Sequence, residues 1–369
     1  MRIVTTSYSR TKEFDNPESW LERINFYTGI LEELAKRHEV ISIERIDYEG
    51  KLQQNGVQYH FINLKKRIVL FPRRMHLFIK KQHPEVVLVH SSDFPLQVIQ
   101  LGWTVGKKAK IIVQNHAEKP ASGIKKFFQR IADRYISAYL FTSAEMGMEW
   151  VEKRIIRSSE KIVEVMEVSS PFYATDKKVG DVIPKASNAS VFLWVARLNA
   201  NKDPLTVIKA FINFLSFQPL AKLYMIYQTE ELLLQMKKLI NSNDKAKENI
   251  KLVGQIPHQK LQDWYDSADF FISGSHFESG GVAVCEAMSC GCIPIVTDIL
   301  SFRKMTGPGK CGLLFEPANY MALLEALLQT QKMDLAKERD KVLQQFKKEL
   351  SFEAIAGKIN GLIAPWSSH

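Results

Sequence analysis

The sequence predicts two doubly wound α/β domains, each with a parallel sheet. Three observations indicate this fold class. A chain of 369 residues is long for one domain. Short apolar, β-branched runs alternate with longer amphipathic stretches, which is the pattern of parallel βαβ units. The pattern also restarts after residues 172–189, which are polar, lack periodicity and contain Gly180 and Pro184.

The expected elements alternate in both halves of the chain. In the first half, the apolar runs predict strands at 2–6, 39–44, 57–62, 85–90, 109–114, 137–142 and 161–168. The amphipathic stretches between them predict helices at 18–37, 67–82, 93–106, 120–135 and 144–157. In the second half, the expected strands are at 190–196, 221–227, 249–253, 269–273, 292–297 and 312–315. The expected helices are at 203–216, 229–241, 258–267, 280–290, 317–330 and 333–349. We therefore expect an N-terminal domain over 1–171, a linker over 172–189, a C-terminal domain over 190–350 and a C-terminal helix over 351–369.

The composition is that of an ordinary soluble globular protein, with 46% apolar and 24% charged residues. The longest apolar runs, such as Val86–Val89, are much shorter than the roughly 20 residues that span a bilayer. The chain starts directly with a strand at Met1–Thr6, without the basic, apolar and small-residue regions of a signal peptide. These features predict a cytoplasmic protein.

The cysteines lie close together, at Cys285, Cys290, Cys292 and Cys311. Their spacing is not that of a secreted disulfide framework, and we interpret them as small core residues in a reducing compartment. Cys290 and Cys292 alone would be half of a metal site, but no second pair or nearby histidine completes four ligands. No metal is expected.

The positive charge is concentrated in one third of the chain. The formal net charge is +10, and the segment 65–130 contains 14 Lys or Arg against 3 Asp or Glu, whereas the remainder contains 36 against 37. Such a region is typical of a face that meets nucleic acid, anionic lipid headgroups or a phosphorylated substrate. The alternative is an ordinary solvated face.

The segment 271–294 is the most informative part of the chain. A buried strand is followed by a short loop, and Gly280 and Gly281 open a helix of small residues. Glycines let the backbone approach a ligand, and the amides of a helix N-terminus bind phosphate. Glu278 lies in the loop and Glu286 lies inside the helix. Both carboxylates are suited to accept hydrogen bonds from the vicinal hydroxyls of a sugar.

A second informative segment, 191–204, is a strand, a tight connection and the start of a helix. Arg197 and Lys202 lie in the connection. Two cations at the carboxyl end of a strand neutralise a diphosphate without a metal, and arginine grips it with two parallel hydrogen bonds. No Asp-x-Asp metal motif accompanies them, because Asp266 and Asp269 have the wrong spacing.

Together these segments resemble the retaining glycosyltransferases of the GT-B fold that carry a Glu–seven residues–Glu motif (group 1, family 4 type). This group includes bacterial capsule, lipopolysaccharide and phosphatidylinositol mannosyltransferases, and the resemblance covers about 190–350 strongly. It implies that Glu278 contacts the transferred sugar and that Glu286 binds the ribose hydroxyls of the nucleotide. It also implies that the amides of Ser279, Gly280 and Gly281 hold the sugar and the diphosphate.

The resemblance extends to three further places. Arg197 and Lys202 match the family's Gly-Arg-Leu-x-x-x-Lys element, whose cations stabilise the leaving nucleoside diphosphate, with Ala196 in place of the glycine. The turn at Gln255 and Ile256 would offer backbone groups to the base, and Tyr265 is interpreted as packing. His116, which follows the core strand 109–114, matches a histidine that faces the donor sugar. His90 is a weaker candidate for the site, and Glu118 is a weaker candidate for the acceptor. Thr6–Arg10 replaces the Gly-Gly loop of many relatives, so no role is carried over there. In relatives the last helix crosses back to pack on the first domain, so the resemblance also implies that the helix over 351–369 returns to the N-terminal domain.

The implied activity is a metal-independent hexosyltransferase without a cofactor. A sugar would pass with retention from a nucleoside-diphosphate sugar to the hydroxyl of a glycan or lipid-linked acceptor, and the leaving phosphate would take the acceptor proton. The cleft between the two facing domains would position the acceptor, as in bacterial surface polysaccharide or glycolipid synthesis. The alternatives are a sugar-nucleotide epimerase on the same fold and a non-catalytic basic module. The Glu278 and Glu286 context disfavours the first, and no recognisable nucleic-acid motif supports the second.

Two segments of the basic region combine cations with apolar side chains. They are 73–81, with Leu77 and Phe78, and 125–130, with Phe127 and Phe128. Amphipathic basic segments of this kind bind anionic lipid surfaces, so we expect peripheral contact of the 65–130 region with the inner membrane face. The alternative is that these helices pack as in any soluble domain.

Overall fold

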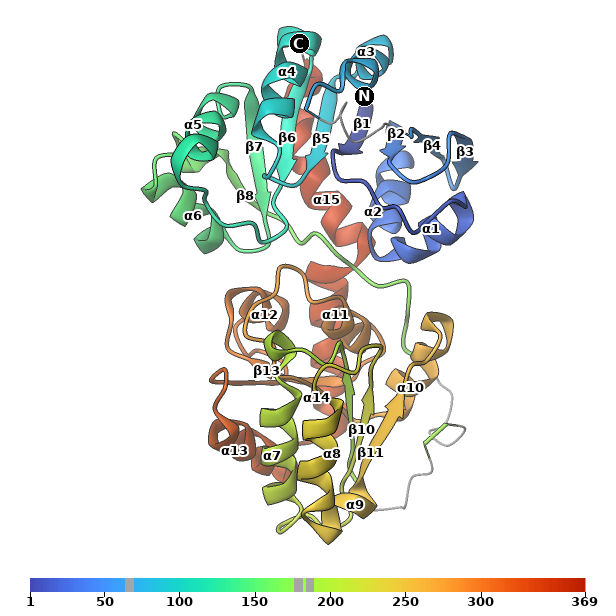
Figure 1. The fold of residues 1–369 in the computed structure, drawn as a ribbon, viewed down its shortest axis with the longest axis vertical. Helices are drawn as coiled ribbons and strands as arrows, with labels where there is room; N and C mark the ends of the chain where they lie inside the picture. Colours follow the sequence, from blue (N-terminus) through green and yellow to red (C-terminus); the bar gives the residue numbers. More distant parts are fainter. Residues whose placement is uncertain (64–69, 176–181, 184–188, 369) are drawn as a thin grey trace. The chain divides into compact units, whose positions relative to one another are not determined.

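The computed structural model describes residues 1–63, 70–175, 182–183 and 189–368. The chain divides into two compact units, which are Met1–Ser169 with Phe352–His369, and Ser170–Ser351. Each unit is a mainly parallel sheet with helices on its faces (Figure 1). The predicted class, α/β with two Rossmann-like doubly wound domains, is confirmed. The boundary between the units lies at Ser169 and Ser170, and the helix after Ser351 belongs to the N-terminal unit.

The sheet of the N-terminal unit has the strand order β3-β4-β2-β1-β5-β6-β7-β8. Its strands are β1 (Arg2–Ser7), β2 (Glu39–Glu44), β3 (Gly50–Gln54), β4 (Val57–Phe61), β5 (Val86–His90), β6 (Lys110–Gln114), β7 (Ile136–Phe141) and β8 (Ile162–Glu164). All neighbours are parallel except β3 and β4. The inner strands β1, β5 and β6 are rich in Val and Ile and buried on both faces, as expected for a sheet covered by helices on both sides.

The helices of this unit mostly follow the predicted amphipathic stretches. They are α1 (Pro17–Arg23), α2 (Asn25–Ala35), α3 (Arg73–Lys81), α4 (Pro95–Val105), α5 (Gly123–Ala132), α6 (Ala144–Glu152) and α15 (Phe352–Ile363). The last of them packs against α2 (Figure 1). Nε2 of His38, which follows α2, lies 2.8 Å from Oδ1 of Asn360 on α15. The final helix is therefore part of the N-terminal unit's structure.

Two local predictions for this unit were wrong. The expected single helix 18–37 is interrupted at Ile24, whose backbone lies outside the helical region (φ −107°, ψ 21°). The sequence reading also missed β3, which forms a hairpin with β4 through Asn55 and Gly56, both at positive φ (49° and 84°). An Asn-Gly pair between two extended runs is the strongest short-range hairpin signal, so this strand could have been found.

The sheet of the C-terminal unit is wholly parallel, in the order β11-β10-β9-β12-β13-β14. Its strands are β9 (Val191–Val195), β10 (Lys222–Ile226), β11 (Ile250–Gly254), β12 (Phe270–Ser273), β13 (Ile293–Thr297) and β14 (Leu313–Phe315). Its helices are α7 (Pro204–Phe214), α8 (Leu233–Asn241), α9 (Asp244–Asn249), α10 (Leu261–Ser267), α11 (Val282–Ser289), α12 (Leu300–Thr306), α13 (Tyr320–Gln329) and α14 (Leu335–Gln345). The short helices α9 and α12 had not been predicted.

The predicted linker is partly described. Residues 176–181 and 184–188 of it lie outside the described residues. The part before them is held by α10, because the amide of Gln262 donates to the carbonyl of Tyr173 (3.0 Å) and the hydroxyl of Thr175 donates to Asp266 (2.7 Å). The chain therefore reaches the C-terminal unit already at Tyr173.

The direction of strand addition reverses once in each unit. In the N-terminal unit the reversal falls between β1 and β5, and in the C-terminal unit it falls between β9 and β12. The loops that leave such a pair of strands diverge to opposite sides, which opens a crevice at their carboxyl ends. In the C-terminal unit these loops are 196–203 and 274–281, the two segments that the sequence had singled out.

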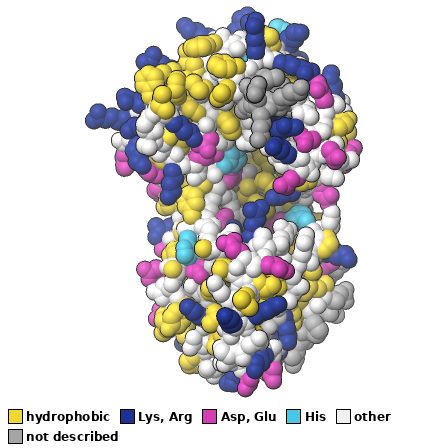
Figure 2. Space-filling model, in the orientation of Figure 1, with side chains coloured by type: hydrophobic (Ala, Val, Ile, Leu, Met, Phe, Trp, Pro, Cys, Tyr) yellow, Lys and Arg dark blue, Asp and Glu magenta, His cyan; other side chains and the backbone are white. Residues whose placement is uncertain are grey.

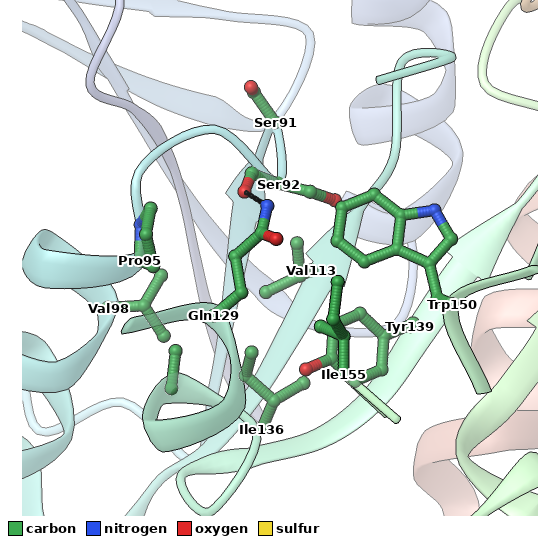
Figure 3. A pocket seen from close by; sticks show the side chains of 11 residues that line it. Ser91, Ser92, Pro95, Val98, Val113, Gln129, Ile136, Tyr139, Trp150 and Ile155 are labelled. Carbon is green, nitrogen blue, oxygen red and sulfur yellow. Dashed lines mark hydrogen bonds between the residues drawn. The ribbon is translucent and has the colours of Figure 1, made fainter. Parts of the chain in front are cut away.

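One small cavity lies in the core of the N-terminal unit. A cavity of about 20 Å³ lies between the β6–β7 face, α4 and α5 of the N-terminal unit, with Gln129 and Trp150 in its wall (Figure 3). A space of this size holds at most one water molecule. Cys285, Cys290, Cys292 and Cys311 are all buried and unpaired as disulfides. Among the described residues, none of the helices is long and apolar enough to cross a bilayer.

Candidate active site

Two loops at the reversal point of the C-terminal sheet are tied to each other by hydrogen bonds. Asn201 accepts from the backbone amide of Phe277 (3.1 Å) and donates from Nδ2 to its carbonyl (3.0 Å). Oδ2 of Asp203 lies 2.9 Å from Nε2 of His276. Gly274 lets the loops approach, because a Cβ there would lie 3.1 Å from the carbonyl oxygen of Asp203. These contacts bring the loop after β9 against the loop after β12.

Lys202 and Glu278 form an ion pair across the two loops. The side chain of Glu278 is 14% exposed and that of Lys202 is 25% exposed, so the pair is only partly solvated. Lys202 ends the 3-10 turn Ala200–Lys202, and its backbone amide donates to Oδ1 of Asn199, the N-cap of the turn (3.1 Å). Arg197 is exposed in the same loop and pairs with no carboxylate in the described part of the chain. The predicted residues Arg197, Lys202 and Glu278 thus lie in the two neighbouring loops at the carboxyl ends of β9 and β12.

The helix α11 begins directly after this pair. Gly281 is its N-cap and has a left-handed backbone (φ 61°, ψ 60°). A Cβ at this position would lie 2.7 Å from Cε1 of Phe302, so both the backbone and the packing require glycine. The first amides of a helix have no intrahelical acceptor, and they give this end a partial positive charge. Ser279, Gly280 and Gly281 therefore lie where an anion is stabilised.

Glu286 is buried within α11 and is held by two side chains from the segment after β11. Oε1 lies 2.6 Å from Nε2 of His258, and Oε2 accepts a hydrogen bond of 2.9 Å from the hydroxyl of Tyr265. The imidazole of His258 stacks on Phe172, with ring centroids 4.9 Å apart. Burial raises the pKa of Tyr265 well above its usual range, and the charge of Glu286 raises it further, so this hydroxyl is a donor at neutral pH.

The sequence reading missed His258 and gave Tyr265 a smaller role than it has. Tyr265 is buried and does pack, as expected, but it also orients Glu286. A tyrosine that packs in the core needs a partner for its hydroxyl, so a polar partner of Tyr265 could have been expected, whereas nothing in the sequence near His258 points to Glu286. Gln255 and Ile256 lie in the same connection, between the end of β11 at Gly254 and His258, with Gln255 exposed and Ile256 half-buried.

In the N-terminal unit, His116 lies in a tight turn at the carboxyl end of β6. The turn is closed by Asn115, whose Oδ1 accepts from the amide of Ala117 (2.9 Å), and by Glu118, which accepts from the amide of His116 (2.7 Å). Nδ1 of His116 forms an ion pair with the buried carboxylate of Glu167. Its Nε2 lies 3.1 Å from Nδ1 of His90.

This contact continues into a chain of polar side chains at the reversal point of the N-terminal sheet. Nε2 of His90 lies 2.6 Å from the hydroxyl of Tyr27 and 3.0 Å from that of Thr5. Glu167, His116, His90 and Tyr27 are therefore connected in one series. His90, a weaker candidate from sequence, lies beside His116, and Glu167 was not singled out at all. The candidate Glu118 serves the backbone of the turn.

The pKa values of the two histidines are shifted in opposite directions. Burial lowers the pKa of His116, but the charge and hydrogen bond of Glu167 and the charge of Glu118 outweigh it, so the pKa is raised. Burial and the neighbouring charge of His116 hold the pKa of His90 well below its usual range. A protonated His116 then donates to Glu167 and to a neutral His90, whose other nitrogen donates to Tyr27 or Thr5. Any sugar hydroxyl at Nε2 of His116 would have to replace His90.

Comparisons with known proteins bear on the C-terminal unit most directly. Residues 177–349 match the family model described as glycosyl transferases group 1. The D-inositol 3-phosphate glycosyltransferase 1 of Catenulispora acidiphila is 29% identical over 84 residues, which are 22% of this chain and 20% of that protein. The O-antigen chain mannosyltransferase B of Escherichia coli is 29% identical over 89 residues, which are 24% and 23% of the two chains. The matched stretches thus span about a fifth of these curated relatives.

The solved structure of HepE from Anabaena in complex with UDP is similar along the whole chain. The TM-score is 0.73 at 12% sequence identity, and the match covers 99% of this chain and 100% of that one. At this identity the likeness concerns the fold, which is that of the GT-B glycosyltransferases. The family model supports the resemblance to the group 1 glycosyltransferases that the motifs indicated, over residues 177–349.

Proposed function

Because residues 177–349 match the family model of the group 1 glycosyl transferases, we propose that the chain transfers a sugar from a nucleoside-diphosphate sugar to an acceptor hydroxyl with retention of configuration. The observation that carries this proposal is the Lys202–Glu278 pair, which lies with Arg197 at the reversal point of the C-terminal sheet. Open α/β sheets bind their ligands at this place. A carboxylate beside two cations suits a ligand with both hydroxyls and a diphosphate.

The cations would stabilise the leaving diphosphate. A lysine ammonium has three donors, and since Glu278 takes one, two remain for phosphate oxygens. Arg197 adds a planar fork, and the amides of residues 279–281 add the positive end of α11. Preorganised donors of this kind lower the barrier because they need no reorientation when charge develops on the leaving oxygen. Such a site needs no metal and no further cofactor.

The carboxylates would hold the two ends of the donor. An ionised carboxylate has about four acceptor positions. Glu286 uses two of them for His258 and Tyr265, which leaves positions for the vicinal hydroxyls of a ribose. Glu278 would accept from the transferred sugar, and the backbone at Gln255 and Ile256 would meet the base. His116, with its Nε2 released from His90, is the proposed sugar contact of the N-terminal unit.

We further propose a glycan or lipid-linked acceptor in the synthesis of a bacterial-type surface polysaccharide or glycolipid. Support comes from the curated relative whose name is O-antigen chain mannosyltransferase B. In the retaining mechanism the leaving phosphate itself takes the proton of the acceptor hydroxyl, so no side-chain base is required.

A donor screen tests the proposal. The purified chain is titrated calorimetrically with UDP-, GDP- and dTDP-sugars, alongside Glu286→Gln and the surface variant Lys237→Ala as a matched control. One donor is expected to bind to the parent and to Lys237→Ala, and to bind more weakly to Glu286→Gln. Nuclear magnetic resonance of the product then reports the anomeric configuration, and an inverted product contradicts retention. Conversion of the donor into its epimer without any acceptor would instead identify an epimerase, and no binding of any donor would overturn the proposal.

A further inference from the structure

Large apolar side chains are exposed along three neighbouring helices of the N-terminal unit. They are Leu70 and Phe71 before α3, Leu77 on α3, Trp103 on α4, and Ile124 and Phe127 on α5, and we refer to these six as the α3–α5 surface. Figure 2 shows hydrophobic side chains gathered over the region of α4 and α5, with Lys and Arg side chains around them. Single exposed apolar residues are ordinary, whereas a contiguous group marks a surface that binds something.

The members are held beside one another by the packing of the three helices. α4 packs against both α3 and α5. The carbonyl of Leu70 accepts a hydrogen bond of 2.9 Å from Gln100 on α4, and Trp103 lies one turn after Gln100. The indole of Trp103 donates a hydrogen bond of 2.5 Å to Tyr135, which follows α5. The aromatic side chain is therefore fixed in an exposed position and is not folded back onto the core.

The structure shows which of the aromatic residues in the basic segments are exposed to solvent. Phe78 and Phe128, which the sequence had grouped with the surface, are half-buried and pack against the core. Leu77 and Phe127, their neighbours in the sequence, are exposed. Ile124 and Phe127 are three residues apart on α5, so they project from the same face of that helix.

Cations surround the apolar side chains. The segment 70–135 contains 12 Lys or Arg and 4 Asp or Glu. Of the carboxylates, Asp133 is buried against Lys161, and Asp93 pairs with Lys125. On α3, Leu77 lies one turn from Arg73 and Arg74 on one side and one turn from Lys80 and Lys81 on the other, and all four cations are exposed. Residues 64–69, which include Lys65, Lys66 and Arg67, lie outside the described residues.

A hollow of about 880 Å³ adjoins the surface on the other side of α3. It shares Leu77 with the surface and is further lined by Arg74, Lys80 and Lys81, which flank Leu77, and by residues of the β3–β4 hairpin, including Lys51. Its wall also contains Glu49, which pairs with Arg74 (2.5 Å), so Lys51, Lys80 and Lys81 are the cations that remain for an anionic headgroup at the edge of the apolar contact.

We propose that the N-terminal unit docks on an anionic lipid bilayer through the α3–α5 surface. The six apolar side chains would enter the headgroup boundary, where tryptophan is favoured, and the surrounding cations would contact lipid phosphates. Each Lys or Arg near an anionic membrane surface raises the partition coefficient by about fivefold. A protein partner would not require this excess of cations around the apolar contact, and it is treated below as an outcome of the test.

Vesicle flotation tests the proposal with the full chain. The probes are vesicles of phosphatidylcholine with about one third phosphatidylglycerol and vesicles of phosphatidylcholine alone, each at low and high salt. The docking variants are Ile124→Ser with Phe127→Ser, and Lys80→Glu with Lys81→Glu. The matched controls are Phe217→Ser, since Phe217 of the C-terminal unit has the same exposed fraction (59%) as Phe127, and Lys237→Glu with Lys238→Glu on α8.

The expected result is salt-sensitive binding to the anionic vesicles only. Both docking variants should lower it by at least tenfold, and both controls should leave it unchanged. Absence of binding at low salt, equal binding to neutral vesicles, or binding that the docking variants do not alter would each overturn the proposal. If the chain instead binds nucleic acid or another protein through this surface when no vesicles are present, the surface belongs to a macromolecular partner and the lipid proposal is overturned. The test uses no sugar nucleotide, so its failure is distinct from a failure of the transferase proposal.

Discussion

The hydroxyl of Tyr265 donates a 2.9 Å hydrogen bond to Oε2 of Glu286, and both groups are buried. The other carboxylate oxygen faces His258 at 2.6 Å. Burying the carboxylate of a helix residue such as Glu286 costs free energy unless hydrogen-bond donors replace its lost hydration. The segment between β11 and β12 supplies two such donors, and they fix the direction in which the remaining acceptor positions of Glu286 point.

Replacing Tyr265 by Phe should therefore affect stability and ligand binding together. We expect the free energy of unfolding to fall by about 1.5–3 kcal/mol, since a hydrogen bond to a charged group is lost. Binding of the donor found in the screen should weaken, because only His258 then orients Glu286. Urea unfolding and calorimetry measure the two effects. An unchanged donor affinity would mean that His258 suffices to orient the carboxylate.

The Lys202–Glu278 pair and Arg197 should matter for turnover more than for folding. Glu278→Gln and Arg197→Ala are expected to lower kcat by about 100-fold or more, the scale seen when one preorganised charge-stabilising group is removed. Circular dichroism and thermal unfolding should remain close to those of the parent, because Arg197 is exposed and Gln is isosteric with Glu. Lys237→Ala on α8 is the control. Parental turnover in either site variant would remove that residue from the proposed mechanism.

The His116–Glu167 pair should make stability fall as pH rises. Since the pKa of His116 in the folded chain lies above the ordinary value of 6.5, its contribution is fully present below about pH 6.5 and is lost as pH rises through the raised pKa. Glu167→Gln should lower the pKa of His116 and flatten this dependence. The lowered pKa values of His60, His76 and His90 act in the opposite direction near pH 6.5, because these side chains are neutral in the folded chain while the unfolded chain still binds protons. These histidines are the same in the parent and in Glu167→Gln, so their contribution cancels when the two slopes are compared.

Urea unfolding between pH 6 and pH 8.5 measures the slope, and histidine resonances report the pKa. The control is a double-mutant cycle, in which Glu167→Gln is measured both in the parent and in the His116→Gln variant. In the His116→Gln background, Glu167→Gln should change the slope no further. An equal change of slope in both backgrounds would show that another group is responsible.

The packing of α15 on α2 can be tested with two glycines of different surroundings. A Cβ at Gly29 would lie 2.5 Å from the ring of Phe352, whereas a Cβ at Gly357 would meet nothing within 4 Å. Gly29→Ala should lower the free energy of unfolding by about 1–3 kcal/mol through overpacking. Gly357→Ala, the matched control within α15, should raise it by up to about 1 kcal/mol through helix propensity. Equal effects of the two substitutions would contradict this packing.

Periodicity in the sequence was enough to predict the fold class and most strands. Each strand of the C-terminal sheet lies within one or two residues of an expected apolar run, because alternation between buried strands and amphipathic helices is a local property of the chain. The positions of Arg197, Lys202 and Glu278 at strand ends followed from the same pattern. Short elements such as α9 and α12 were missed, since a turn or two of helix leaves no periodic signal.

What only the tertiary structure decided is which of these residues meet. The sequence separates Glu286 from His258 by 28 residues, His116 from Glu167 by 51 and Gly29 from Phe352 by 323, and none of these contacts is visible in a local pattern. The difference between Phe127 and Phe128, one exposed and one half-buried, likewise depends on how α5 rotates against α4. Backbone periodicity is set by neighbours within one or two turns, whereas the partners of a side chain are set by the packing of elements far apart in the chain.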